Sequence, residues 1–76
     1  MVLAFVMINV KVGTDSEVAT YLRSAPNVRS VFDVYGTYDL IVELEAPTLE
    51  ALYEALSSSV RKLDNVISTH TLVAVK

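Results

Sequence analysis

The chain has 76 residues, of which 53% are hydrophobic and 20% charged, and its net charge is −3. This length allows one domain at most, residues 1–76, and buries too little surface to be comfortably stable alone. There is no cysteine, which excludes disulfides and thiolate-bound metal sites. We therefore expect oligomerisation to supply the missing stability. The absence of cysteine also agrees with a cytoplasmic location, which we expect. The six basic residues are scattered, and no apolar run approaches the roughly 20 residues that span a bilayer, so we expect neither direct nucleic-acid binding nor membrane insertion.

The first half of the chain predicts a strand followed by a helix. Residues 3–12 are rich in Val, Ile and Phe, which favours a strand that ends at Gly13. Thr14 and Glu17 have the spacing of a capping box, so we expect a helix over about residues 15–24. The residues that recur at spacings of three and four predict its buried stripe: Val18, Tyr21, Leu22 and Ala25.

The second half predicts a β-hairpin, a second helix and a final strand. Two extended runs, residues 28–35 and 38–45, are joined through Gly36 and Thr37. Thr48 is placed to cap a second helix. A final strand over residues 66–75 is rich in β-branched side chains. The apolar residues of the second helix recur every three or four positions: Leu49, Leu52, Tyr53, Leu56, Val60 and Leu63.

The order β-α-β-β-α-β predicts the ferredoxin-like fold, an α+β architecture with a four-stranded antiparallel sheet and two helices on one face. Phe5 and Met7 of the first strand and Ile41 of the third then fall on the face without helices. Apolar residues on an open sheet face are typical of an interface, so we expect a symmetric face-to-face homodimer, although scattered exposed apolar residues are the alternative. The residues predicted to face the helices are Val6, Ile8, Val10, Leu40, Val42 and Leu44.

Residues suited to catalysis or metal binding are scarce. His70 is the single histidine and lies in the middle of the predicted last strand. Nucleophilic catalysis needs a nucleophile beside a base, and one imidazole does not make a metal site without further ligands. We therefore expect no enzymatic activity, no metal and no cofactor.

The hairpin carries the most suggestive residues. Gly36 permits a backbone conformation closed to other residues, and Asp39 places a carboxylate at the start of an apolar strand. Asp39 suits the ammonium of a free amino acid, with turn amides and nearby hydroxyls serving the ligand's carboxylate. The residues alone favour the alternative, in which Gly36 and Asp39 only shape the turn. Tyr35 and Tyr38 flank the turn and are placed to wall a pocket. A second polar cluster, which is also ordinary strand composition, consists of Ser68, Thr69 and Thr71.

Two segments resemble the effector domain of Lrp/AsnC regulators, also called the RAM domain. Residues 34–42, Val-Tyr-Gly-Thr-Tyr-Asp-Leu-Ile-Val, resemble the Gly-x-x-Asp signature at that family's second hairpin. Residues 68–73, Ser-Thr-His-Thr-Leu-Val, resemble its last strand, which commonly reads Thr-x-Thr before an apolar run. The similarity covers essentially the whole chain and preserves the order of elements.

The resemblance implies a dimer joined through its sheets, assembly of dimers into rings or discs of the octamer or decamer type, and small effectors, typically amino acids, held between neighbouring dimers. Full-length members carry an N-terminal helix-turn-helix domain, whereas this sequence begins at the first strand of the effector domain. We therefore expect a module that senses an amino acid, or associates with full-length Lrp/AsnC relatives, without binding DNA directly. The predicted effector-binding residues are Tyr35, Gly36, Thr37, Tyr38, Asp39, Leu49, Ser68, Thr69 and Thr71.

Two other families share this order of elements. ACT domains also bind amino acids, and their effector loop follows the first strand, where Gly13, Thr14 and Asp15 stand in this sequence. Dimeric α+β-barrel proteins enclose a pocket that acts on small molecules in some members, and His70 is the candidate residue for such an enzyme. Both interpretations stay open at this point.

Overall fold

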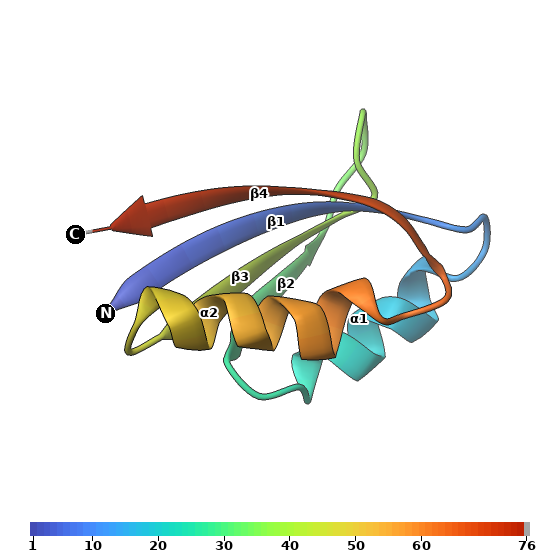
Figure 1. The fold of residues 1–76 in the computed structure, drawn as a ribbon. Coiled ribbons are helices and arrows are strands. Elements are labelled where there is room, and N and C mark those ends of the chain that lie inside the picture. The colour runs from blue at the N-terminus through green and yellow to red at the C-terminus, as the bar shows by residue number, and fades with distance from the viewer. Residues whose placement is uncertain (76) are drawn as a thin grey trace.

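The computed structural model describes residues 1–75 and shows the predicted order of elements. Four strands form one antiparallel sheet in the order β2-β3-β1-β4: β1 (Val2–Val10), β2 (Val28–Asp33), β3 (Leu40–Ala46) and β4 (Val66–Val75). The helical segments are α1 (Asp15–Arg23), α2 (Leu49–Ala55) and the π-helical turns η1 (Leu56–Arg61), into which α2 continues directly. Both helices lie on the same face of the sheet (Figure 1), which confirms the ferredoxin-like fold. None of the helices in residues 1–75 has the length and apolar character needed to cross a membrane.

The face of the sheet beneath the helices forms the core. All six residues predicted to face the helices are buried: Val6, Ile8, Val10, Leu40, Val42 and Leu44. α1 adds Val18 and Leu22, whereas α2 and η1 add Leu52, Leu56 and Val60. Burial of this apolar surface is the main force that holds the two layers together. The period-two pattern of the strands therefore predicted the correct side for each of these side chains.

The buried stripes of the helices differ from the predicted ones. Tyr21 and Tyr53 are 44% and 51% exposed, so their assignment to the core was wrong. Val18, Ala19 and Leu22 form the buried face of α1, which turns Tyr21 outward. The predicted stripe left out Ala19, which is fully buried and whose small size lets the helix approach the sheet. The N-terminal end of the second stripe, Leu49, is also exposed.

The two helices begin in different ways. The Thr48 hydroxyl oxygen accepts a hydrogen bond of 3.1 Å from the amide of Ala51, which confirms the predicted cap of α2. The predicted capping box of α1 was wrong, because the Thr14 hydroxyl instead donates to the carbonyl of Lys11 at 2.7 Å. Thr14 has φ −106° and ψ 2°, outside the extended conformation in which an N-cap side chain reaches the first helical amides.

The connection between β2 and β3 is longer than the predicted two-residue turn. The strands separate after the pair Asp33–Leu40, which leaves a six-residue loop, residues 34–39. The hairpin still closes at its base, where the amide of Val34 donates to the carbonyl of Asp39 at 3.1 Å. Figure 1 shows this loop rising on the side of the sheet opposite the helices. The hairpin loop, as we call residues 34–39, is therefore available to ligands or to another copy of the chain.

The open face of the sheet carries the residues predicted for a dimer interface. Met7 lies directly between Ile41 of β3 and His70 of β4, and side chains of such opposed residues share one face. Phe5 and Leu72 are paired in the next row, and Phe32 of β2 lies beside Ile41. Phe5, Met7 and Ile41 thus have the predicted orientation, and their role in an interface stays a prediction.

Candidate effector site

Asp39 is fixed at the end of the hairpin loop by hydrogen bonds to β1. Its amide donates to the carbonyl of Ile8 at 3.0 Å, and its carboxylate oxygen Oδ2 accepts from the amide of Val10 at 2.9 Å. The main chain thus continues the β1–β3 ladder by one step, and the carboxylate satisfies the first amide beyond it. Asp39 therefore has the turn-shaping role that the residues alone favoured.

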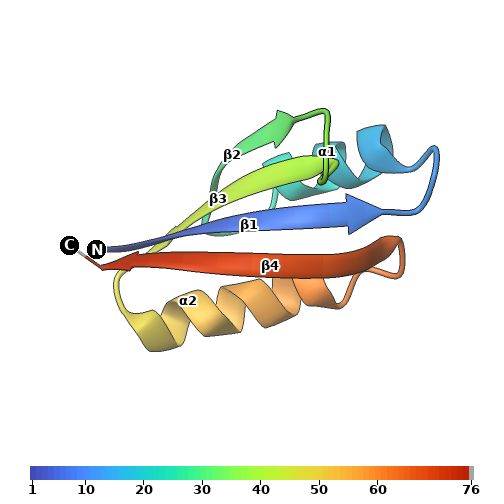
Figure 2. The same cartoon turned by 90° about the horizontal axis from the view of Figure 1, so that it is seen from above.

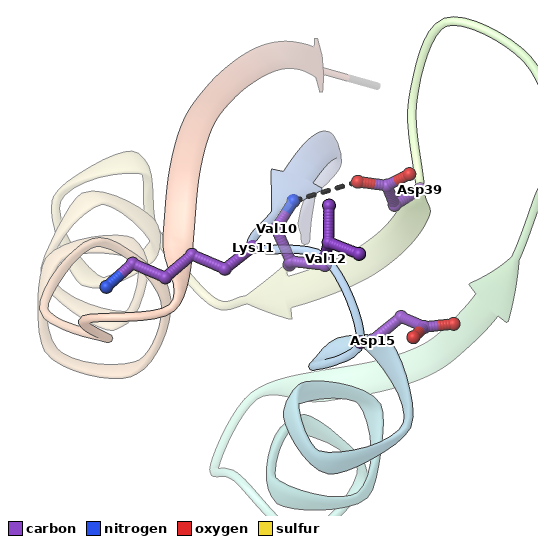
Figure 3. Close-up of a pocket in the computed structure, with 6 residues that line it drawn as sticks. Val10, Lys11, Val12, Asp15 and Asp39 are labelled. Carbon is purple, nitrogen blue, oxygen red and sulfur yellow. Dashed lines mark hydrogen bonds between the residues drawn. The ribbon is translucent and has the colours of Figure 1, made fainter.

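The Asp39 carboxylate also lines a cleft with a volume of about 270 Å³. The other walls come from Val10 and from the turn between β1 and α1, which contributes Lys11, Val12, Gly13 and Asp15. Figure 3 shows the Asp39 and Asp15 carboxylates on the same side of this turn, with the Lys11 side chain directed away from them. The cleft thus presents two acidic groups, and it has the electrostatic character to hold a positively charged group.

The rest of the hairpin loop packs against the open face of the sheet. The side-chain amide of Asn9 donates to the carbonyl of Thr37 at 3.0 Å. The ring of Tyr38 meets that of His70 edge to face, with centroids 5.7 Å apart. Such aromatic pairs contribute about 0.5–1.5 kcal/mol. These contacts hold the loop against β1 and β4, whereas Tyr35 at its tip is fully exposed.

The structure separates the predicted effector residues into several groups. Ser68 lies opposite Asn9, on the hairpin-loop side of the sheet. Thr69 and Thr71 lie opposite the buried Ile8 and Val6, so their side chains point toward the helical layer. Leu49 begins α2 at the end of the molecule where the two termini meet, far from the hairpin loop (Figures 1 and 2). Within one protomer, only Asp39 of the predicted set lines the cleft.

The β1–α1 turn was missing from the predicted effector-binding residues, and the sequence pointed to it only under the ACT alternative. Lys11, Val12, Gly13 and Asp15 line the cleft although they precede Asp39 by more than twenty positions in the sequence. β1 ends at Val10 rather than at Val12, and Val12 is fully exposed in the turn. Gly13 has φ +84°, the left-handed region that favours glycine, which a search for turn chemistry after the first strand would find.

The fold and cleft define a class of protein, a small ferredoxin-like domain with a polar ligand-sized cleft beside its first loop. Residues 1–75 contain no group of three or more His, Cys, Asp or Glu side chains arranged to hold a metal ion. The family model of the Lrp/AsnC ligand binding domain matches residues 3–76. The chain belongs to this family, which decides against the ACT interpretation.

The curated relatives that the chain matches come from the genus Pyrococcus. The chain is 36% identical over 75 residues to the HTH-type transcriptional regulator FL11 of Pyrococcus furiosus and 34% identical over 74 residues to FL11 of Pyrococcus horikoshii. The match covers 99% and 97% of this chain but only 49% and 48% of those regulators. The chain thus spans about half the length of the curated relatives it matches.

Solved structures confirm the fold. A hypothetical protein, PHS023 of Pyrococcus horikoshii, superposes with a TM-score of 0.96 at 36% identity, over 100% of this chain and 92% of that one. FFRP-DM1 superposes with a TM-score of 0.94, also at 36% identity, over 99% and 100% of the two chains. AsnC of E. coli, at 22% identity, shares the fold with a TM-score of 0.89 over 99% of this chain and 51% of its own.

Proposed function

We propose that the chain binds a small amino-acid effector at the Asp39 cleft and acts as an oligomeric regulatory module without catalytic activity. The observation that carries this proposal is the position of the Asp39 carboxylate, held by the Val10 amide at the edge of a cleft of about 270 Å³. A fixed carboxylate is a preorganised site because little side-chain entropy is lost when the ligand binds. Kinship with transcriptional regulators supports both the regulatory role and a cytoplasmic location.

The ligand's ammonium is the group that Asp39 recognises in this proposal. One carboxylate oxygen already accepts the Val10 amide, and the other accepts no hydrogen bond among residues 1–75. Charge-assisted hydrogen bonds between ammonium and carboxylate are stronger than neutral ones. Asp15 on the same cleft adds negative potential, which also disfavours a purely anionic ligand. A neighbouring copy serves the ligand's carboxylate in this proposal, because Asp39 is the hairpin-loop residue that lines the cleft within one protomer.

A second copy of the chain covers the open sheet face in this proposal. Phe32 and Leu72 are 53% and 60% exposed on that face and flank the half-buried Met7 and Ile41. Exposed apolar groups in one contiguous area are typical of an interface, and a two-fold dimer is the simplest arrangement that covers the same patch on both copies. Higher assembly of such dimers would bring Leu49, Thr69 or Thr71 of a neighbour toward the Asp39 cleft.

Regulation through full-length relatives is the proposed output. The net charge is −3, and the two ion pairs formed within residues 1–75 both occupy arginines, Arg23 with Asp33 at 3.8 Å and Arg29 with Glu45 at 3.4 Å. A surface of this kind has no basic stripe to neutralise DNA phosphates. Association with an HTH-type relative would let this module change that regulator's assembly without contacting DNA itself. A regulator from Neisseria meningitidis with the same fold, 17% identical, is described as a complex with L-Met, which supports an amino-acid-sized ligand.

The decisive experiment is calorimetric titration of the purified protein with each common amino acid, combined with melting curves. We expect at least one amino acid to bind and to raise the melting temperature, because a ligand that binds the native state stabilises it by mass action. Asp39→Asn is expected to weaken that binding about tenfold while leaving the fold intact, since the Asn carbonyl can still accept the Val10 amide.

The matched control is Asp33→Asn, which removes a carboxylate from the other end of the same hairpin loop, where it only faces Arg23. This variant should bind the ligand as the original chain does. Equal affinity of the Asp39→Asn variant would contradict the ammonium role, and the absence of binding by any amino acid would contradict the effector function as a whole.

A further inference from the structure

A second cleft, with a volume of about 130 Å³, is lined by residues of α1 and of the chain that leads from η1 to β4. Figure 1 shows these two segments on the helical side of the sheet. The cleft neighbours the Asp39 cleft, because the amide of Lys11 donates to the carbonyl of Asn65 at 2.9 Å. We call it the helix groove and define it by the residues that line it: Glu17, Val18, Tyr21, Leu63, Asp64 and Asn65. None of these belongs to the predicted effector site.

The helix groove has an apolar floor and one aromatic ring among its lining residues. Val18 and Leu63 belong to or pack against the core, which fixes the floor of the groove. Tyr21, at 44% exposure, is the large side chain that α1 turns outward instead of burying. A half-exposed ring over a fixed apolar floor offers a π-face for stacking without first having to move other side chains.

The rim of the helix groove is acidic. Glu17 comes from α1 and Asp64 from the turn before β4, so the two carboxylates lie on opposite elements. Neither forms an ion pair with a basic side chain within residues 1–75, where the arginine pairs involve Asp33 and Glu45. Burial of these carboxylates by a neutral apolar partner would remove their hydration without replacement. The acidic rim therefore favours a partner that carries positive charge.

We propose that the helix groove docks an arginine side chain presented by a protein partner. A guanidinium is planar, so it can stack on the Tyr21 ring while its five N–H donors reach Glu17 and Asp64. A lysine ammonium would satisfy the carboxylates but not stack in the same way, which makes arginine the better match. The helix groove stays open when the sheet faces of two copies pair. Its lining residues differ from those of the Asp39 cleft, although the two clefts are joined by the hydrogen bond of 2.9 Å from the Lys11 amide to the Asn65 carbonyl.

The test uses a short capped peptide, acetyl-Gly-Ser-Arg-Ser-Gly-amide, titrated into the ¹⁵N-labelled full chain and followed by amide NMR shifts. The comparison peptide replaces arginine by citrulline, which has nearly the same shape without the charge. We expect the arginine peptide to shift the amides of residues 17–21 and 63–65 at millimolar concentration. The citrulline peptide should leave them unchanged.

Tyr21→Leu is expected to weaken the arginine peptide about fivefold, in keeping with a cation–π contribution of about 0.5–1 kcal/mol. The matched control is Tyr53→Leu, because Tyr53 on α2 is 51% exposed and lies three residues after Glu50, yet lines neither cleft. That variant should bind the peptide unchanged. Asp64→Asn, in an exposed turn, is expected to weaken binding by a similar factor and carries the test if Tyr21→Leu lowers the melting temperature strongly.

Three results would overturn the proposal. They are the absence of shifts at residues 17–21 at millimolar peptide, equal binding of the citrulline peptide, and equal loss in the Tyr21→Leu and Tyr53→Leu variants. The last result would mean that the peptide only recognises exposed tyrosines on an acidic surface. Effector binding at Asp39 would stand or fall separately in each case.

Discussion

The two faces of the sheet differ in the burial of their side chains although they are built from the same strands. In β3, Leu40, Val42 and Leu44 are fully buried beneath the helices, whereas Ile41, Glu43 and Glu45 alternate with them on the open face and are half-buried. The chain seals the covered face with its own helices and leaves apolar side chains on the other face, interrupted by glutamates. Apolar side chains on an open sheet face are typical of an interface, which is the basis of the proposed dimer.

The largest expected effect comes from a cavity in the covered face. Leu40→Ala should lower the free energy of unfolding by about 2–5 kcal/mol, because the side chain is fully buried and the helices cannot collapse completely into the space. Denaturant unfolding measures the change. Leu72→Ala, which truncates an exposed leucine on the open face, is the control and should change the stability of the monomer by no more than about 0.5 kcal/mol. Equal losses in the two variants would mean that both faces are sealed within one chain.

The next effect concerns the joint between the hairpin loop and β1. Asp39→Ala removes the acceptor of the Val10 amide, a partly buried charge-assisted hydrogen bond, and should cost about 1.5–3 kcal/mol of folding stability. Asp39→Asn keeps an acceptor and should cost clearly less. Melting curves of the two variants separate the structural role of Asp39 from its proposed ligand role. If the alanine variant is as stable as the original chain, the Val10 hydrogen bond does not hold the loop.

The open face is tested most directly by placing a charge in its apolar row. Ile41→Glu should raise the dimer dissociation constant by at least about tenfold, equivalent to about 1.4 kcal/mol, because a buried unpaired carboxylate loses its hydration at the interface. Light scattering over a concentration series measures the mass. Thr20→Glu, which adds the same charge to the exposed side of α1, controls for net charge. An unchanged mass for Ile41→Glu would show that the open face is not the contact between copies.

The sequence carried enough information for the fold because its signals are periodic and local. Alternation in β1 and β3 identified the buried face, and Thr48 marked the start of α2 with a hydrogen bond that the structure contains. Tyr21 was misassigned because an apolar pattern weighs a tyrosine above Ala19, whereas packing selects the smaller residue. The alternation within strands and the Thr48 cap were thus predicted correctly, whereas the Thr14 cap and the length of the hairpin loop were not, although these signals are local too. The buried stripe of α1 depends on the spacing between layers and was predicted only in part.

The candidate site was predicted only in part because its contacts are long-range. Asp39 stood out by its position before an apolar strand, but the residues that hold the loop are distant in the sequence. Asn9 lies 28 positions before its partner Thr37, and Val10 lies 29 positions before Asp39. The contribution of Lys11 and Asp15 to the cleft depends on where β1 ends relative to β3, which no local motif encodes. His70 was correctly expected in the middle of a strand, and its contact with Tyr38 appears only once β4 lies beside β1.

The smallest expected effect concerns Thr71. Its hydroxyl is either an unpaired buried group that lowers stability or a contact to the effector. Its hydroxyl oxygen is buried on the helical side and has no hydrogen-bond partner within residues 1–75. Thr71→Val replaces it by a methyl group of similar size and should stabilise the fold by up to about 1 kcal/mol, because a buried unpaired hydroxyl is removed. Thr69→Val, on the same side of β4, should change stability by no more than about 0.5 kcal/mol, because the Thr69 oxygen is not among the buried unpaired atoms of residues 1–75. Thr71→Val could instead leave stability unchanged and weaken effector binding in calorimetry. This result would mean that Thr71 reaches the ligand of a neighbouring copy, as the Thr-x-Thr resemblance implies. The helical side of β4 would then take part in the site.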